Sequence, residues 1–503
     1  MELLKLSVAL LPFAVLLVGF IVFRMSALKL SFYVWMLEVA VALILYHMGI
    51  LKLFGSSIWG NLAIWSGFAV LYTGQIFGQN IRSTGILKVM LDTLGKLHPS
   101  KAGRAVSLSS VVGGFVGAFN GFATYPVTIP GLVELGISGM RAAVGYLVYF
   151  SWSIAFVSLF IAATIASRAS GLPIAEIAQV MGLFTIPLVV VSVIGFFRIM
   201  KFDLGKKENL SLALIVMVGN IAAIVLFTQV FTEYYILTLI ASSTFCLLLL
   251  YAYRLLATGK AVEEASGETA THSALDVFKA FAPLAVGVLV VVLWKIPAIS
   301  SVINGLTFKV GFWGYKPFAV NLFRTPGFYV LVTALSCYLF AITKGAKPWK
   351  DLKIATKRSA DSLMTLFCGG AMVYLMVDTG QIALLAKSFA SWGGTVYAGL
   401  LSGVGFLAGI AFGQGLPACF MFAKMQVNAA QLVGLPLVIL VGIAALVTMG
   451  PPNPLKPSLI RYTSSLANIK GKDGEMFRMA FPWQILQLFV IVVCVVLYML
   501  YVV

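Results

Sequence analysis

Residues 111–137, VVGGFVGAFNGFATYPVTIPGLVELGI, form a stretch that is apolar as a whole but interrupted by glycines, prolines and an asparagine. A second stretch of this kind, residues 403–435, reads GVGFLAGIAFGQGLPACFMFAKMQVNAAQLVGL. Glycine destabilises a helix by about 1 kcal/mol relative to alanine, and proline by about 3 kcal/mol. In lipid, the backbone groups freed by such breaks need other partners. Neither stretch is therefore expected to be a plain spanning helix, and paired broken segments of this kind point to a transport site.

The composition places the whole chain in a membrane. Of its 503 residues, 61% are hydrophobic and only 10% are charged, and the mean hydropathy is +1.02. Soluble proteins carry about 25% charged residues. Since one span needs about 20 apolar residues, the chain has room for roughly a dozen transmembrane helices. We expect an all-α, multi-pass protein of the cell membrane whose first apolar run, residues 6–23, is retained because it lacks a signal-peptide cleavage site.

Several other classes of protein do not fit the sequence. The net charge is +18, but the 35 Lys and Arg residues lie mostly in short loops, as membrane topology requires, so nucleic acid is not an expected partner. The five cysteines and three histidines show no metal-ligand spacing, and no cofactor is predicted. An enzyme is not predicted either, because no nucleophile, metal or cofactor motif is found.

A set of matches in the same order indicates an internal duplication. The matched pairs are Ser83-Thr84-Gly85 with Asp378-Thr379-Gly380, Gly113-Gly114-Phe115 with residues 403–406, Asn120-Gly121 with Gln414-Gly415, Leu135-Gly136-Ile137 with Val433-Gly434-Leu435, and Ser151-Trp152-Ser153 with Met449-Gly450-Pro451. A polar segment at residues 258–275 divides the chain into a first repeat, 1–257, and a second, 276–503. The positions of the broken segments predict two inverted repeats, each with a re-entrant hairpin and a broken helix, as in elevator-like secondary transporters.

The expected spans follow from the apolar runs. We predict single spans over residues 30–51, 59–77 and 177–197, an interfacial helix over 86–104, and a span over 142–166 interrupted at Ser151-Trp152-Ser153. In the second half, a basic connector over 344–358 precedes a separate span over 363–376, and a half-span over 437–449 precedes the proline-rich break at 450–457.

Both halves resemble the lactate permease family. Residues 425–435, MQVNAAQLVGL, resemble the family's LQ-x-x-A-A-x-x-L-G-L segment, and Pro457 followed by residues 471–478, GKDGEMFR, resembles its SPQ…GKEGEIFR segment. In the first half, residues 121–124, GFAT, resemble the family's GFGTP, with Tyr125 inserted before Pro126. The resemblance implies uptake of small 2-hydroxy monocarboxylates together with protons, and a fold of the ion-transporter superfamily type.

The chain also departs from the family pattern. The family has a Glu-Gly pair ahead of GFGTP, where this chain has Gly117 and Ala118. The family's second hairpin carries GSDTSSN, whereas here Gly409 is followed by IAFGQ. Both family carboxylates are therefore absent, and proton coupling would need another titratable group.

The broken stretches suggest the substrate site. A half-helix directs free N–H groups and a positive dipole end toward the midplane, where a carboxylate can bind. The alternative is that the polar side chains only cap or join half-helices. The candidate substrate-binding residues are Asn120, Gly121, Thr124, Ser151, Ser153, Gln414, Gly415, Asn453, Lys456 and Arg461.

Among these residues, Arg461 lies about one turn after the break at residues 450–457. An arginine at mid-membrane is costly unless it is paired or hydrated, so Arg461 is expected either to clamp the substrate carboxylate or to pair with Asp378. Asp378 and Glu38 are the candidates for coupling to protons or ions, because carboxylates inside a membrane are expensive. For these two residues the alternative is an ion pair with a loop Lys or Arg.

These observations predict a secondary active transporter of small organic anions, of the lactate or glycolate type, driven by proton symport. The alternative is a sodium-coupled organic-anion carrier or a sodium/proton exchanger of the same fold group. A channel or a membrane-embedded enzyme is the remote alternative. The expected partners are a small carboxylate, a coupling proton or sodium ion, and the lipid bilayer. The sequence leaves open whether the protein is a monomer or a homodimer.

Overall fold

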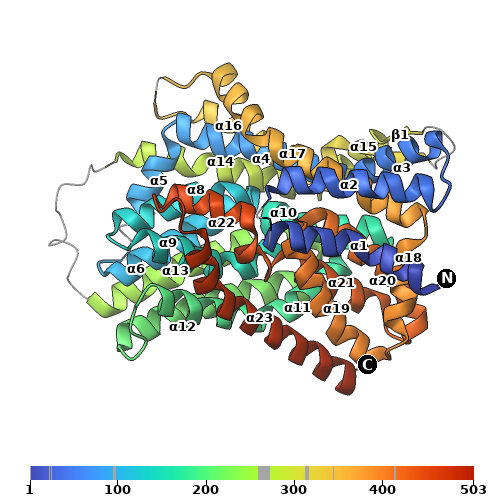
Figure 1. The fold of residues 1–503 in the computed structure, drawn as a ribbon. Helices are drawn as coiled ribbons and strands as arrows, with labels where there is room; N and C mark the ends of the chain where they lie inside the picture. Colours follow the sequence, from blue (N-terminus) through green and yellow to red (C-terminus); the bar gives the residue numbers. More distant parts are fainter. Residues whose placement is uncertain are drawn as a thin grey trace.

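The computed structural model describes residues 2–21, 23, 25–94, 98–258, 272–311, 317–343, 345–412 and 415–502. Helices dominate these ranges (Figure 1). The helices of the first half are α1 (Glu2–Ile21), α2 (Ala27–Ile44), α3 (Ile50–Ala63), α4 (Trp65–Ser83), α5 (Ile86–Leu94), α6 (Lys101–Val106), α7 (Gly113–Phe119), α8 (Gly121–Glu134), α9 (Gly139–Phe150), α10 (Val157–Ser170), α11 (Ile174–Ile199), α12 (Lys207–Val225) and α13 (Thr238–Thr258).

The second half is also helical apart from one small sheet. Its helices are α14 (Ala274–Leu293), α15 (Pro297–Gly305), α16 (Pro326–Leu339), α17 (Pro348–Asp378), α18 (Gln381–Ala390), α19 (Gly394–Ala411), α20 (Gly415–Val433), α21 (Leu437–Met449), α22 (Pro457–Leu466) and α23 (Asp473–Tyr501). The strands β1 (Phe308–Val310) and β2 (Phe318–Val320) pair in antiparallel fashion, with Phe308 opposite Val320.

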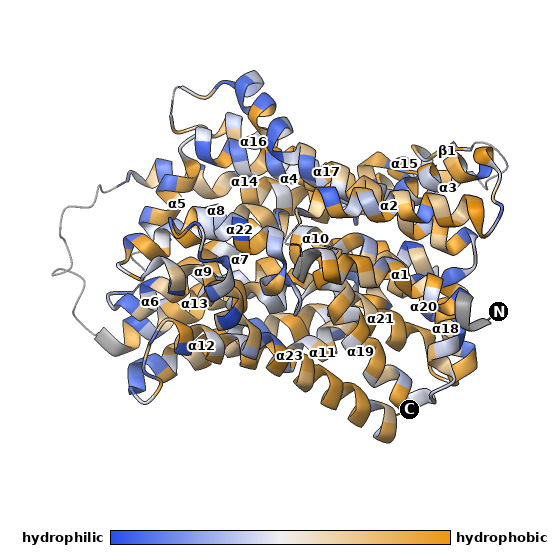
Figure 2. Ribbon diagram, in the orientation of Figure 1, coloured by the Kyte–Doolittle hydropathy of each residue, from blue (hydrophilic) through white to orange (hydrophobic). Residues whose placement is uncertain are grey.

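The helices confirm a polytopic membrane protein. Within the described ranges, nine helical segments are long and apolar enough to cross a membrane, and the bent pair of Gly139–Ala155 and Val157–Ser170 makes a tenth. The pair is bent by 48° at its break, as the interruption in the sequence predicted. Figure 2 shows apolar residues over most of the helices, with hydrophilic residues concentrated toward one end of the molecule.

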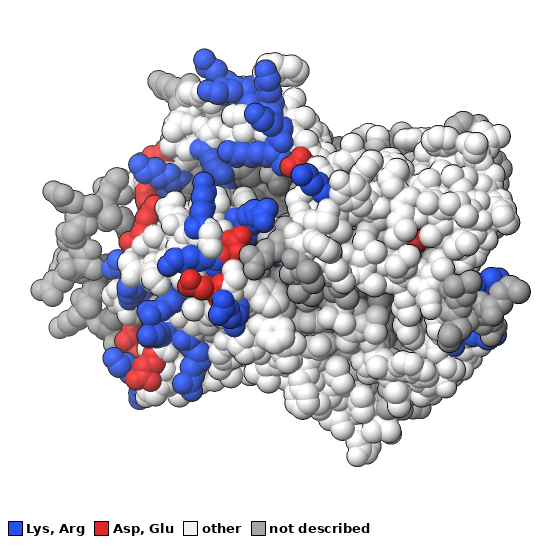
Figure 3. Space-filling view, viewed as in Figure 1, with Lys and Arg blue, Asp and Glu red and all other residues white. Residues whose placement is uncertain are grey.

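That end also carries most of the visible charge. Figure 3 shows Lys and Arg gathered over the end that holds α5, α6 and α12, and at the start of α17. The loop between α11 and α12 and the loop before α17 both lie there (Figure 1). We call this the basic end; the positive-inside rule predicts that it faces the cytoplasm.

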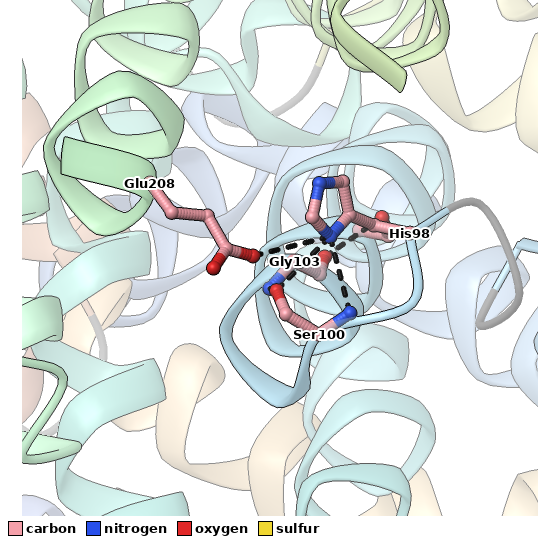
Figure 4. Close-up of polar contacts among 5 residues, drawn as sticks. His98, Ser100, Gly103 and Glu208 are labelled. Atoms are coloured by element: carbon pink, nitrogen blue, oxygen red, sulfur yellow. Dashed lines mark hydrogen bonds and ion pairs between the residues drawn. The ribbon is translucent and has the colours of Figure 1, made fainter. Parts of the chain in front are cut away.

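His98 joins the start of α6 to α12 at the basic end. Its Nδ1 lies 3.2 Å from the backbone nitrogen of Ser100 and 3.0 Å from the Ser100 hydroxyl (Figure 4). Glu208, in the first turn of α12, places Oε1 3.9 Å from the same nitrogen. The Ser100 hydroxyl in turn accepts a hydrogen bond of 3.1 Å from the Gly103 N–H and so caps α6.

Three of the predicted helix boundaries are wrong. The apolar run 30–51 is not one helix, because α2 ends at Ile44 and the chain turns through His47, whose φ is 49°. The run 59–77 is divided at Ile64. The third correction concerns the basic connector 344–358: from Pro348 onward it continues without a break into the following span as the 31-residue helix α17.

The length of α17 explains the third error. At 1.5 Å per residue the helix is about 46 Å long, whereas the hydrocarbon core of a bilayer is about 30 Å thick. Its basic first half therefore lies outside the core at the basic end, where a helix needs no apolar face. The linker predicted at 258–275 falls largely on residues 259–271, outside the described residues; α13 ends at Thr258 and α14 begins at Ala274.

Candidate functional site

The first broken stretch forms a helical hairpin. One arm consists of α6, a π-helical segment from Ser107 to Val112, and α7; the other arm is α8. A Cβ at Gly117 would lie 3.0 Å from Cγ2 of Thr124, and one at Gly113 would lie 3.3 Å from Oγ1 of Thr128. These contacts pair residues at equal distances on either side of the Asn120–Gly121 peptide bond, so the arms run antiparallel and the tip is at Asn120 and Gly121.

The second broken stretch also forms a hairpin, made of α19 and α20. The Tyr397 hydroxyl donates a hydrogen bond of 2.7 Å to Oε1 of Gln426, which joins the two arms. A Cβ at Gly394 would lie 2.9 Å from the backbone oxygen of Val433. The prediction that neither stretch is a continuous spanning helix is confirmed.

Each hairpin is followed by a broken span, and the two breaks touch. The first break is the 3-10 turn Ser151–Ala155 between α9 and α10, and the second is the segment between α21 and α22. A Cβ at Gly450 would lie 3.1 Å from the backbone oxygen of Ser151. The sequence matches these two positions to each other.

A cavity lies between the two hairpins and the two breaks. Its empty space is about 710 Å³, including the space at its mouth. We call it the inner cavity. Its described lining residues are Gly67, Val70, Leu71, Asn120, Gly121, Phe122, Tyr125, Ile154, Val157, Ser158, Ile161, Gly415, Leu416, Met449, Asn453, Lys456, Ser458 and Leu459. Asn120 and Gly415 belong to opposite hairpins, so the two tips meet at one cavity.

Asn120 fixes the tip of the first hairpin. Its side chain is 3% exposed, and its Oδ1 accepts a hydrogen bond of 3.0 Å from the Phe122 N–H, which caps α8. A Cβ at Gly74 of α4 would lie 2.6 Å from Asn120 Cγ, so only glycine leaves room for this amide. Asn120 is therefore a cap and also part of the cavity wall.

Lys456 is the one charged residue among the described lining residues of the inner cavity. It is 4% exposed, and no ion pair to it is found within the described ranges. Its Nζ lies 3.3 Å from the position of a Cβ at Gly415, the first residue of α20. The ammonium and the free N–H groups of this helix start together favour a bound anion.

Asn453 and Tyr125 close the cavity from the two halves of the chain. Nδ2 of Asn453 donates a hydrogen bond of 2.8 Å to the Tyr125 hydroxyl. Ser158 lies opposite, and its hydroxyl accepts a 3.5 Å hydrogen bond from the Gly121 N–H. Ser158 and the next two residues have φ of 51°, 56° and 61°, a left-handed turn that costs about 1–2 kcal/mol per residue. This strained turn brings the start of α10 to the hairpin tip.

A second, larger cavity adjoins the inner one on the side of the basic end. Its empty space is about 1180 Å³, including its open mouth, and we call it the vestibule. The two cavities share Asn120, Phe122, Ser458 and Leu459. The remaining lining residues of the vestibule are Gln75, Gly78, Gln79, Arg82, Ala123, Pro126, Arg358, Asp361, Ser362, Tyr462 and Leu466.

Three predicted site residues make their contacts elsewhere. The Thr124 hydroxyl donates to the backbone oxygen of Gly121 at 2.8 Å, inside the hairpin. The Ser151 hydroxyl lies 2.8 Å from Nε2 of Gln487 on α23, and the Ser153 hydroxyl donates to the Phe150 backbone oxygen at 2.7 Å. None of the three lines either cavity. Gln414 lies outside the described residues.

The structure places Arg461 away from both cavities. Its side chain is 65% exposed, and Nε lies 3.8 Å from Oδ2 of Asp473. The expectation that Arg461 sits at mid-membrane stays a prediction, and the structure shows only that its side chain, on α22 (Pro457–Leu466), is exposed at the protein surface. The alternative pairing with Asp378 is not found: within the described residues, the ion pair of Arg461 is with Asp473.

Glu38 and Asp378 lie together near the end opposite the basic end. Glu38 is fully buried, and its Oε2 accepts a hydrogen bond of 2.9 Å from Nε2 of Gln381. Asp378 accepts a hydrogen bond of 2.5 Å from the Ser56 hydroxyl. Gly369 of α17 packs against Pro417 of the second hairpin. Asp378 lies nine residues further along α17, so it is about 14 Å away from this contact along the helix axis.

The sequence analysis missed Tyr125, Ser158, Arg82 and Arg358. Tyr125 carried a signal, because it is the residue inserted into the GFGTP-like segment. Arg82 lies in the polar end of α4, where Gln79 and Asn80 also stand, but nothing in the sequence links it to Arg358. That pairing depends on how α4 packs against α17.

Paired hairpins and broken spans that meet at one cavity, in a chain of multiple membrane spans, define a multi-pass membrane transport protein. The comparisons with known proteins give the family. The chain belongs to the L-lactate permease family, whose model matches residues 6–314 and 314–503. The L-lactate permease of Streptococcus iniae is 22% identical over 439 residues, which cover 84% of this chain and 90% of that protein.

A solved structure gives a more distant match. The YdaH transporter of Alcanivorax borkumensis, described as having an unusual topology, aligns over 90% of this chain and 88% of its own, with 15% sequence identity and a TM-score of 0.44.

Proposed function

We propose that this protein is a secondary active transporter that takes up small 2-hydroxy monocarboxylates of the lactate and glycolate type by proton symport. The observation that carries the proposal is the inner cavity, where a buried Lys456 without an acidic partner among the described residues faces the start of α20. The family and the curated relative support transport rather than catalysis.

In the proposed site, Lys456 and the N–H groups at the start of α20 hold the substrate carboxylate. Hydrogen bonds to a charged group contribute about 1.5–3 kcal/mol each. The proposal assigns binding and orientation of the substrate 2-hydroxyl to the amide of Asn120 and the hydroxyls of Tyr125 and Ser158, three residues that line the inner cavity. The apolar remainder of the wall, such as Leu71 and Ile161, suits the short carbon skeleton of a monocarboxylate and disfavours a second carboxylate.

Glu38 is the best-supported candidate for the coupling proton. Its Oε1 and the Oε1 of Gln381 are both buried without a hydrogen-bond donor among the described residues. A carboxylic acid supplies one O–H donor, whereas a carboxylate supplies none, so the neutral acid satisfies this pair better. Asp378 stays a second candidate, since it lies on the same side of the molecule as Glu38.

We further propose that residues 1–257 and 276–503 are inverted repeats. The support is the recurring order of hairpin and broken span, and the contact between the matched segments 151–153 and 449–451, which Ser151 and Gly450 make. A homodimeric assembly stays a prediction.

Counterflow of labelled L-lactate in proteoliposomes tests the function. Exchange without an ion gradient, and accumulation when the outside is made acidic, are expected. Accumulation that follows a sodium gradient and not a proton gradient would favour the sodium-coupled alternative. If no monocarboxylate exchanges in vesicles that contain folded protein, the proposal fails.

A further inference from the structure

We infer that the vestibule holds a second, outer binding station for small carboxylate anions, formed by Arg82 and Arg358. In uptake, substrate would reach this station after it leaves Lys456 and passes Asn120; substrate that enters from the basic end would bind there first. The inference rests on the proposed function and adds a binding site outside the inner cavity.

The two arginines come from different helices and face the same space. Arg82 is half-buried in the last turn of α4, and it lines the vestibule together with Tyr462 and Arg358. Arg358 is exposed on α17, and its Nη1 donates a hydrogen bond of 2.9 Å to Oε1 of Gln79. Both line the vestibule.

The positive charge in the vestibule is not balanced by an ion pair. Within the described ranges, no carboxylate lies at salt-bridge distance from Arg82 or Arg358. Asp361 also lines the vestibule, but it pairs with neither arginine, so the three charged lining residues sum to +1. Two guanidinium groups that line one cavity repel each other, and an anion bound between them relieves that repulsion.

Neighbouring hydrogen bonds hold the station in shape. Nε2 of Gln79 donates to Oδ1 of Asp351 at 2.9 Å, and the Tyr338 hydroxyl donates to the other carboxylate oxygen, also at 2.9 Å. Asp351 is therefore occupied by neutral donors and orients Gln79. The oxygen of Gln79 is in turn directed at Arg358, which leaves the other guanidinium nitrogens free to bind a carboxylate as a planar fork.

The two cavities define the order of binding. The vestibule lies on the side of the basic end, and Asn120 and Leu459 belong to the walls of both cavities. A carboxylate that leaves Arg82 and Arg358 therefore meets Asn120 next and Lys456 after it. Because the station is partly exposed, it is expected to bind weakly and to act mainly by raising the local concentration of anions.

The test is the double variant Arg82→Gln/Arg358→Gln, assayed by counterflow of labelled L-lactate presented at the basic end. At about 0.01 M ionic strength, where the Debye length is about 30 Å, the apparent KM is expected to rise by about fivefold, the value that corresponds to ~1 kcal/mol. At about 1 M ionic strength, with a Debye length of about 3 Å, the variant and the wild type should converge. The maximal rate should be unchanged.

The control is the double variant Lys353→Gln/Lys357→Gln. It removes two positive charges from exposed positions on α17, the helix that carries Arg358, but neither lysine lines the inner cavity or the vestibule. Its KM should match that of the wild type, and Arg82→Lys/Arg358→Lys should keep most of the wild-type behaviour. A wild-type KM in the double glutamine variant at every ionic strength, or an equal loss in the control, overturns the inference. Absence of exchange in the wild type would instead refute the proposed function.

Discussion

Replacing Lys456 with methionine separates a binding role from a structural one. Methionine has a similar length and no charge, so the change removes the ammonium while it keeps most of the packing. In the ligand-free protein, Lys456 is 4% exposed and has no acidic partner within the described ranges. An uncompensated buried charge destabilises a fold. The change should therefore weaken binding and stabilise the empty protein.

The structure sets the size of both effects. Loss of one partner of a buried, hydrogen-bonded charge pair costs about 2–5 kcal/mol of binding free energy, which weakens L-lactate binding by a factor on the order of 30 to several thousand. Removal of the unpaired charge should raise the stability of the ligand-free protein by about 1 kcal/mol or more. A residue that only supports the fold would show losses in both measurements.

Counterflow in proteoliposomes measures the first effect, and the thermal unfolding midpoint of the solubilised, ligand-free protein measures the second. Lys472→Met serves as the control, because Lys472 is exposed just before α23. Two results would contradict the reasoning: wild-type L-lactate affinity in Lys456→Met, or a marked drop of its unfolding midpoint without substrate.

Three further predictions follow from single contacts. Gly74→Ala places a Cβ 2.6 Å from Asn120 Cγ. The clash should lower the stability of the fold by about 1–3 kcal/mol and displace Asn120, so transport should fall sharply. The control Gly49→Ala, where a Cβ would have nothing within 4 Å, should transport as the wild type does. Burial lowers the pKa of His98, and the negative charge of Glu208 only partly opposes this shift. The neutral histidine therefore stabilises the fold fully above the unfolded-state pKa of about 6.5, and this stabilisation is lost as the pH falls toward the folded-state pKa. The thermal unfolding midpoint should drop between pH 7.5 and 5.5 by less in His98→Gln than in the wild type. Glu38→Gln should abolish accumulation driven by a pH gradient while counterflow continues, and intact accumulation would remove Glu38 from the coupling step.

The sequence predicted the hairpins because their signal is local. Glycine and proline weaken a helix wherever they stand, and Asn120 is a strong N-cap residue, so the tip at Asn120-Gly121 could be located without knowledge of the packing. The broken span at Ser151-Trp152-Ser153 was located in the same way. The half-span that ends at Met449 was placed to the residue, because the prolines at 451 and 452 cannot continue it.

The errors concern features that depend on packing rather than on the local sequence. Hydropathy does not show where an apolar run turns, so the breaks at His47 and Ile64 were missed. The contacts of Arg461 were inferred from its distance along the chain from the break, but that distance does not say which face of α22 lies at the protein surface. Lys456, five residues earlier, faces inward at the break itself. Of these two cations, Arg461 is exposed and lies near Asp473, whereas Lys456 is buried and has no ion pair among the described residues.

The contrast with the family pattern gives Lys456 a further meaning. In the family's SPQ segment a serine precedes the proline, whereas Lys456 precedes Pro457 here. The same chain lacks the acidic residues that the resemblance implies in both hairpins, and the one charged residue among the described lining of its inner cavity is a lysine. A cavity with carboxylates must first be neutralised by protons or cations before it can accept an anion, whereas a cavity with a lysine attracts the anion directly. In the proton symport that we propose, a carboxylic acid outside the described lining of the inner cavity would carry the coupling. We propose Glu38 for this role, because it is fully buried and its carboxylate accepts a hydrogen bond from Gln381.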